Sequence, residues 1–366
     1  MKGERDMLIS NEYSYLLHLL SCAVNGQTPC NIPSELDPRK LFLFAERHGV
    51  SALTFPAISK TDINDRELFS KWKERHDRAY YCAVCQMNAR NELISAFENN
   101  KIGFIEAQGT VVRNYYPNPN DRTMSDIDFI VDENRLTDVE EILVSLGYEI
   151  CYPHVGEINA HRLPNINIEI HTRFFRNENR FYDALTLSFE SSVIDDTTLF
   201  LYTVLHAIKH IEIGGCGIRR VLDIYLLNNK LENIDRNEVN SVLKNCRAKR
   251  EADNLIALCQ VWFAGKEHTS DTYKLEKFIL SGGSNGTLKN RLDVSFSRDN
   301  RKFKKTRYVF SRLFPPLDKM KKRFPVLQKW SVLLPFFWIW RIIITPRKTI
   351  SGEYMSVKKA ETENVL

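Results

Sequence analysis

The chain has 366 residues, 43% of them hydrophobic and 11% aromatic, which is ordinary for a globular protein with room for two or three packed units. The apolar stretch at residues 16–24 is interrupted or flanked by polar side chains and no small-residue cleavage site follows it, which argues against a secretory leader, and we expect a cytoplasmic protein. The net charge of +5 is uneven, because residues 289–323 hold 13 Lys and Arg against three acids. Such a run is typical of a solvated face, and it also suits phosphates, nucleic acid or anionic lipid.

Eight cysteines are scattered along the chain, and this favours reduced thiols. Cys82 and Cys85 form the one close pair, and no second pair stands at zinc-site spacing. We therefore expect core thiols there rather than a metal or redox site.

The N-terminal region, residues 12–100, places apolar side chains at helical spacing. The period then changes: residues 102–107 read as a strand, Gly109 opens a short helix, and residues 117–121 form a loop. Residues 124–131 predict a second strand, followed by a helix that stops at Gly147.

Strict alternation in residues 165–171 predicts another strand, with Glu169 and His171 on one face. Helical patterns resume at Thr197, and the glycine-rich stretch 282–286 is the best internal linker. The sequence thus predicts an α+β fold, with a small mixed sheet wrapped by N- and C-terminal helices. Its segments are 1–100, helical; 101–190, the core; 191–281, helical and packed on the core; and 282–366, basic, aromatic and helical.

Three carboxylates are the candidates for chemistry. Residues two apart in a strand point the same way, so Asp126 and Asp128 are expected on one face, about 7 Å apart. Glu169 on a neighbouring strand would complete the set. Such a cluster suits Mg²⁺ or Mn²⁺, and two ions held about 4 Å apart would support an in-line phosphoryl displacement.

Phosphate contacts are predicted just upstream. Gly109 and Thr110 would offer backbone N–H groups and a hydroxyl at a helix N-terminus, and Arg122 would add a fork of donors. Each signal is weak in isolation, since a lone Asp-x-Asp is more often a solvated strand edge.

The order of motifs is more specific than any one of them. The chain carries Gln108-Gly109, Tyr116-Pro117-Asn118-Pro119, Arg122, Asp126-Ile127-Asp128, Gly147-Tyr148, Glu169-Ile170-His171, Leu205-His206, His210, Leu222-Asp223, and a tail from Leu313-Phe314-Pro315 through Trp340-Arg341. From about Phe44 to Arg341 it resembles the uncharacterised nucleotidyltransferase family called the NTP-transferase-5 group, within the polymerase-beta-like superfamily.

The resemblance implies the polymerase-beta-like nucleotidyltransferase fold, with residues 101–190 as its core. It also implies metal on Asp126 and Asp128, with Glu169 as the third acid. One position departs from the family: Gln108 stands where Lys is usual, which removes a cation from the expected phosphate site.

Other polar residues have two interpretations. His206 and His210 stand at i and i+4 without the Glu of a zinc-hydrolase motif, so packing or hydrogen bonding against the sheet is favoured over contact with nucleotide or acceptor, and metal binding comes last. His171 is a candidate nucleotide-binding residue. Asp223 is expected to pair with Arg219, Arg220 or a nearby backbone group.

The apolar stretch Trp330–Ile344 is broken by Pro335 and Arg341 and is too short to span a bilayer. Core packing is the favoured interpretation. The alternative is contact with a bilayer surface, since cationic residues flank its aromatics.

The sequence therefore predicts a metal-dependent nucleotidyltransferase in which Asp126, Asp128 and Glu169 are catalytic. It would move an NMP from an NTP to an unknown acceptor, such as a sugar phosphate, peptide, protein or RNA. Two alternatives stay open: a non-catalytic nucleotide-binding or regulatory module with this fold, and an assembly factor at an anionic membrane surface.

Overall fold

The computed structural model describes residues 10–152, 156–189, 192–284, 286–287, 289–291, 294, 314–317, 320–321 and 324–344. The chain forms two compact units. The first comprises Met1–Ile211 and Cys216–Ser284, and the second comprises Glu212–Gly215 and Asn285–Leu366. Most of the basic run at 289–323 lies outside the described residues, as does Leu313 of the predicted tail.

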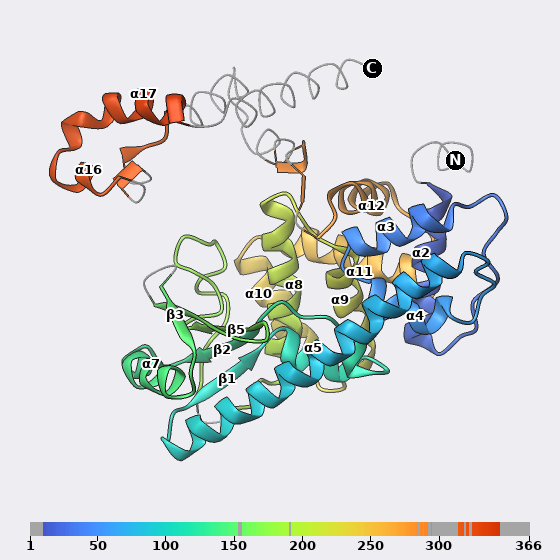
Figure 1. The fold of residues 1–366 in the computed structure, drawn as a ribbon, viewed down its shortest axis with the longest axis horizontal. Coiled ribbons are helices and arrows are strands. Elements are labelled where there is room, and N and C mark those ends of the chain that lie inside the picture. The colour runs from blue at the N-terminus through green and yellow to red at the C-terminus, as the bar shows by residue number, and fades with distance from the viewer. Residues whose placement is uncertain are drawn as a thin grey trace. The chain divides into compact units, whose positions relative to one another are not determined.

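Among the described residues of the first unit, four helices come first, where helical spacing predicts them (Figure 1). Asp37 and Asp65 accept backbone N–H bonds at the starts of the second and fourth, so each start has a side-chain cap. The helices are α2 (Asn11–Asn25), α3 (Pro38–Arg47), α4 (Ser51–Ile58) and α5 (Arg66–Asn99). Cys82 and Cys85 lie on α5 as free, half-buried thiols, and Cys85 packs against a buried apolar cluster.

A five-stranded mixed sheet follows, with strand order β1-β2-β5-β4-β3. Strand β2 runs parallel to β5, and the other neighbours are antiparallel. The strands are β1 (Phe104–Ala107), β2 (Ile127–Val131), β3 (Glu149–Cys151), β4 (Glu157–Arg162) and β5 (Ile166–His171). The fold is thus α+β, as predicted.

Strand β2 begins at Ile127, three residues later than the sequence predicts, so Asp126 precedes the strand. Two side chains that are distant in sequence bond to this segment: Gln86 Nε2 donates to the Met124 carbonyl, and Asn167 Nδ2 donates to the Ser125 carbonyl. These two carbonyls therefore accept bonds from side chains instead of from a neighbouring strand, and β2 does not extend over residues 124–126.

Strand alternation separates the two faces of the sheet. Ile127 and Phe129 of β2 and Ile168 of β5 join a buried cluster with α5 and with α7 (Leu136–Ser145), which cover that face (Figure 1). Because successive strand residues point to opposite faces, Asp128 and Glu169 point away from this cluster. The apolar face of the sheet therefore packs on helices, and the other face carries the polar side chains of the candidate site.

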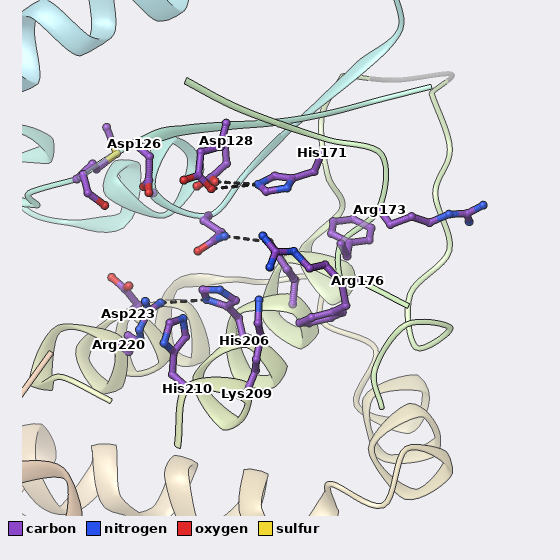
Figure 2. A pocket seen from close by; sticks show the side chains of 18 of the residues that line it. Asp126, Asp128, His171, Arg173, Arg176, His206, Lys209, His210, Arg220 and Asp223 are labelled. Carbon is purple, nitrogen blue, oxygen red and sulfur yellow. Dashed lines mark hydrogen bonds and ion pairs between the residues drawn. The ribbon is translucent and has the colours of Figure 1, made fainter. Parts of the chain in front are cut away.

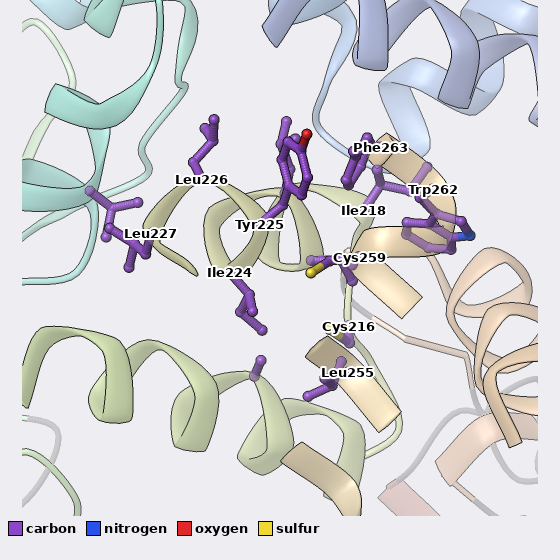
Figure 3. Packing of buried hydrophobic residues seen from close by; sticks show 14 of the residues in the cluster. Cys216, Ile218, Ile224, Tyr225, Leu226, Leu227, Leu255, Cys259, Trp262 and Phe263 are labelled. Carbon is purple, nitrogen blue, oxygen red and sulfur yellow. The ribbon is translucent and has the colours of Figure 1, made fainter. Parts of the chain in front are cut away.

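Five helices complete the first unit: α8 (Asp196–Glu212), α9 (Ile218–Lys230), α10 (Arg236–Asn245), α11 (Lys249–Ala264) and α12 (Ser270–Gly282). Ile224 of α9 and Leu255 and Cys259 of α11 belong to one buried cluster with α8 and α2 (Figure 3). Short elements fill the connections: α6 (Gly109–Val112), η1 (Arg113–Tyr115), η2 (Pro119–Asp121) and η3 (Glu133–Arg135). This core fixes α8 and α9, which matters for the site below.

The second unit contains α16 (Val326–Lys329), η4 (Ser331–Leu333) and α17 (Leu334–Ile344). Phe337 packs on Phe324, but Phe336 and Trp340 are 59% and 46% exposed, so core packing is wrong for this side of the stretch. An apolar run does not specify whether every side of its helix is covered. Within the described residues, no helix has the length and apolarity needed to cross a membrane.

Candidate active site

A cavity of about 250 Å³ lies between the polar face of the sheet and helices α8 and α9. Asp126, Asp128 and His171 approach it from the sheet, and Lys209 and Arg220 approach it from the helices (Figure 2). We call the carboxylates of Asp126, Asp128, Glu157 and Glu169 the acidic wall. The side chains of His206, Lys209, His210 and Arg220 form the basic wall.

The acidic wall follows from strand pairing. Asp128 of β2 and Glu169 of β5 are directly opposite one another in the parallel register, so their side chains share a face. Asp126 lies one residue before β2 and still lines the same cavity. The structure thus brings together the three carboxylates that the sequence singles out.

The closeness of the three carboxylates changes the pKa of Asp126. Burial, together with the charges of Asp128 and Glu169, raises the pKa of Asp126 from 3.8 to about 6. Without a further cation, the ionised form of Asp126 is therefore disfavoured. A positive ion placed among them would remove that penalty.

His171 is the cation that the chain itself supplies. Its Nε2 lies 3.4 Å from Asp128 Oδ1 and 3.5 Å from Glu169 Oε2, and its Nδ1 lies 3.6 Å from Glu157 Oε1. Burial by itself would lower the pKa of His171, but the contacts with these three carboxylates raise it well above 6.5. The same contact lowers the pKa of Glu169.

Glu157 is a site residue that sequence reasoning missed. It lies opposite His171 on β4, and Arg176 holds its carboxylate with two bonds of 2.5 and 2.6 Å. Although burial alone would raise the pKa of Glu157, His171 and Arg176 lower it to about 2. Polar and apolar residues alternate over residues 157–161, and this pattern could have predicted the strand that carries Glu157.

The donor set suits a hard cation. Among the described residues, Asp128, Glu169 and His171 each offer a ligand atom, and these atoms lie within 4.8 Å of one another. Two carboxylates with room for water and phosphate oxygens are what Mg²⁺ prefers, and an imidazole is also acceptable to Mn²⁺. The raised pKa of Asp126 is the independent sign that positive charge fits here.

The turn after β1 places Gly109 against the cavity. A Cβ at Gly109 would lie 2.7 Å from Met124 Sδ and 2.8 Å from Arg122 Nη1, so a side chain does not fit without displacement. Gly109 begins α6, as predicted, and lines the cavity. Thr110 is buried, donates its hydroxyl to the Ala107 carbonyl at 3.0 Å, and does not line the cavity.

Arg122 was predicted to bind phosphate, but its guanidinium bonds to a carboxylate of the chain. Its Nε and Nη2 donate to Asp223 Oδ1 and Oδ2 at 2.9 and 2.8 Å, and Tyr116 donates its hydroxyl to the same carboxylate at 2.6 Å. The fork is therefore occupied by Asp223 rather than free for phosphate. The expectation that Asp223 pairs with Arg219, Arg220 or backbone is wrong, because Arg122 reaches it across the fold.

The basic wall comes mainly from one face of α8. Tyr202, His206 and Lys209 stand at i, i+4 and i+7, and all three line the cavity. His206 Nδ1 lies 3.0 Å from Arg220 Nη1, and its ring is 4.6 Å from that of His210. The histidines thus contact α9, each other and the cavity, where the sequence favoured packing against the sheet.

Burial, followed by the charge of Arg220, lowers the pKa of both histidines: well below 6.5 for His206 and to about 3 for His210. The imidazoles are therefore neutral at pH 7. Positive charge on this wall comes from Lys209 and Arg220.

The chain shows structural likeness to the antibiotic-resistance factor ANT(2'')-Ia, with 12% sequence identity and a TM-score of 0.35 over 46% of this chain and 95% of that chain. A comparison with curated proteins found no match. The profile of the family described as uncharacterised nucleotidyltransferase matches residues 34–264, well over half of the sequence. This chain therefore belongs to that nucleotidyltransferase family.

Proposed function

We propose that the protein is a metal-dependent nucleotidyltransferase that moves an NMP from an NTP to an acceptor hydroxyl or phosphate. The observation that carries the proposal is that three carboxylates of the acidic wall, Asp126, Asp128 and Glu169, share one cavity in a chain of a nucleotidyltransferase family. Nucleotidyl transfer needs chiefly positioning and charge neutralisation, which this arrangement supplies.

Asp128 and Glu169 would hold Mg²⁺ or Mn²⁺, with Asp126 completing the set and His171 beside it. Such an ion neutralises phosphate oxygens and polarises the phosphorus that is attacked. The acceptor oxygen then bonds to the α-phosphorus, the bond to the β-phosphate oxygen breaks, and pyrophosphate leaves.

The chain's own residues divide the remaining work. Glu169 assists metal binding or accepts the acceptor's proton, which requires the carboxylate form that its lowered pKa favours. Gly109 lines the cavity beside the acidic wall, and we assign its backbone to the phosphate contact. We assign Thr110 and Arg122 to positioning this segment, since their polar groups bond to Ala107 and Asp223.

The test uses two labels on the same nucleotide. Each NTP, labelled at the α- or the γ-phosphate, is incubated with the protein, Mg²⁺ and a cell lysate. We expect α-label, and no γ-label, to enter an acceptor. Transfer of γ-label would identify a kinase, and metal-dependent NTP binding without any transfer would identify a non-catalytic nucleotide-binding module.

A second candidate function is favoured by the exposed aromatics of the second unit. Trp330, Phe336 and Trp340 are 63%, 59% and 46% exposed, and the Phe336 and Trp340 rings stack 6.3 Å apart. Exposed aromatics beside cationic residues suit the interface of an anionic bilayer. We propose that this surface makes a peripheral membrane contact.

Co-sedimentation of the full-length protein with phosphatidylcholine vesicles, with and without phosphatidylserine, tests this contact. The double variant Phe336→Ser, Trp340→Ser should bind anionic vesicles at least about 10-fold more weakly. Leu43→Ser is the matched control, because Leu43 is 63% exposed on α3. Equal vesicle binding by both variants would remove the membrane proposal.

A further inference from the structure

Two cations on the basic wall face the cavity without a carboxylate partner. Across the described part of the chain, no carboxylate lies within ion-pair distance of Lys209 or Arg220. The Lys209 side chain makes no hydrogen bond to these residues either, and the Arg220 side chain contacts His206. By contrast, Arg122 and Arg176, which border the same cavity, are each held by a carboxylate through two bonds.

Unpaired cations in a partly buried position carry a desolvation cost. Burial and then the charges of Arg176 and Arg220 lower the pKa of Lys209. An anion placed in the cavity would offset this cost, and the neutral His206 and His210 leave it two further groups to contact. The wall is thus complementary to negative charge.

The acidic wall, on the other side of the cavity, restricts which anions can bind. A free phosphate would be repelled by Asp126, Asp128 and Glu169. A polyphosphate is suited to both walls, because oxygens near one end can share a cation with the carboxylates while oxygens at the other end reach Lys209 and Arg220. A ligand that meets both requirements is the triphosphate of a metal-bound nucleotide.

We propose that Lys209 and Arg220 form the polyphosphate subsite, binding the β- and γ-phosphates of the NTP. The assignment rests on the proposed nucleotidyl transfer and adds the residues that hold the leaving group. In this arrangement the α-phosphate lies toward the acidic wall. Pyrophosphate remains on the basic wall after the bond to it breaks, so Lys209 and Arg220 also stabilise the charge that develops on it.

Inorganic tripolyphosphate with Mg²⁺ probes this subsite without turnover. We expect Lys209→Gln to weaken its binding, measured by calorimetry, by about 10-fold or more, since one charge-assisted bond is lost. Lys209→Arg should retain most of the affinity. Lys244→Gln, the same charge change at an exposed position of α10, is the matched control and should bind as the wild type does.

A nucleoside monophosphate provides the second arm. Its affinity should be the same in wild type and Lys209→Gln, because it lacks β- and γ-phosphates. Equal loss of monophosphate and tripolyphosphate binding would overturn the assignment, and so would tripolyphosphate binding that is equal in Lys209→Gln and Lys244→Gln. Lys209-dependent tripolyphosphate binding in a protein that transfers no label would keep the subsite and reject the transfer reaction.

Discussion

The two walls of the cavity are built in opposite ways. The acidic wall is held by the sheet: backbone pairing places Asp128 beside Glu169 whether or not their charges favour it. The basic wall is held by one face of α8 and by α9, whose apolar sides are locked into the helical core. Each wall concentrates one sign of charge, so the cavity is prepared for a ligand that brings both signs, as a metal-bound triphosphate does.

The walls are also joined directly. Arg122 precedes Asp126 in the chain, and its partner Asp223 lies on α9, three residues after Arg220. Gln108 at the sheet end donates to the Tyr202 hydroxyl of α8 at 3.0 Å. These bonds set the separation of the walls, and their loss should have structural consequences that the loss of a cavity-facing charge does not.

The largest effect should come from breaking the buried bond between the walls. Arg122→Met leaves the Asp223 carboxylate buried without its cation, and we expect the free energy of unfolding to fall by about 3–5 kcal/mol. Arg39→Met is the control, since its pair with Asp65 lies at the surface and its loss should change the free energy of unfolding far less. Equal losses in urea denaturation of the two variants would contradict a structural role for Arg122.

Next in size is the loss of a metal ligand from the acidic wall. Asp128→Asn should weaken Mn²⁺ binding at least about 100-fold, because even outer-shell partners of a metal typically contribute 10- to 100-fold. Its stability without metal should stay close to that of wild type, because the variant relieves the repulsion on Asp126 but loses the contact with protonated His171. Unchanged metal affinity in calorimetry would end the assignment of Asp128.

A smaller effect is expected on the basic wall, where His210 makes the free energy of unfolding depend on pH. Unfolded histidine takes up a proton near pH 6.5, whereas folded His210 stays neutral down to about pH 3. Between these values the unfolded state binds more protons, so this stability is present above pH 6.5 and is lost as pH falls. His210→Gln should flatten the pH dependence of the unfolding free energy in that window, by at most about 1.4 kcal/mol per pH unit. An unchanged slope would show that His210 is not held neutral.

The smallest change is Gln108→Lys, which restores the cation usual in the family. If residue 108 faces phosphate, NTP affinity should rise a few-fold through the added charge. The gain is limited because the bond from Gln108 to Tyr202 is lost. Unchanged or weaker NTP affinity in a folded variant would show that the family's lysine position has no counterpart here.

Sequence alone could predict three of the four carboxylates of the acidic wall, because strand parity is a local property. Alternation across residues 165–171 puts Glu169 and His171 on one face, and the structure keeps that arrangement. Even here the start of β2 was misjudged, since the carbonyls of Met124 and Ser125 bond to distant side chains. Moving the start of the strand does not change which residues share a face, and Asp126 still lines the cavity.

The basic wall and the bond between the walls were beyond sequence reasoning because both depend on how α8 and α9 dock. Arg122 and Asp223 are 101 residues apart, and nearer arginines offered plausible partners for that carboxylate. Lys209 and Arg220 look like ordinary surface cations until the cavity between helix and sheet is known. Glu157 was missed for a similar reason, since its significance comes from lying opposite His171.

The most direct test of the central claim is the rate at which α-label from an NTP enters an acceptor, compared in wild type, Asp128→Asn and Asp132→Asn. Asp132 follows β2 and lies outside the cavity lining, so it controls for loss of one charge. We predict Mg²⁺-dependent labelling by wild type and Asp132→Asn, and a loss of at least about 100-fold in a folded Asp128→Asn protein. Equal labelling by Asp128→Asn and wild type would contradict the claim that this cavity is a nucleotidyl-transfer site.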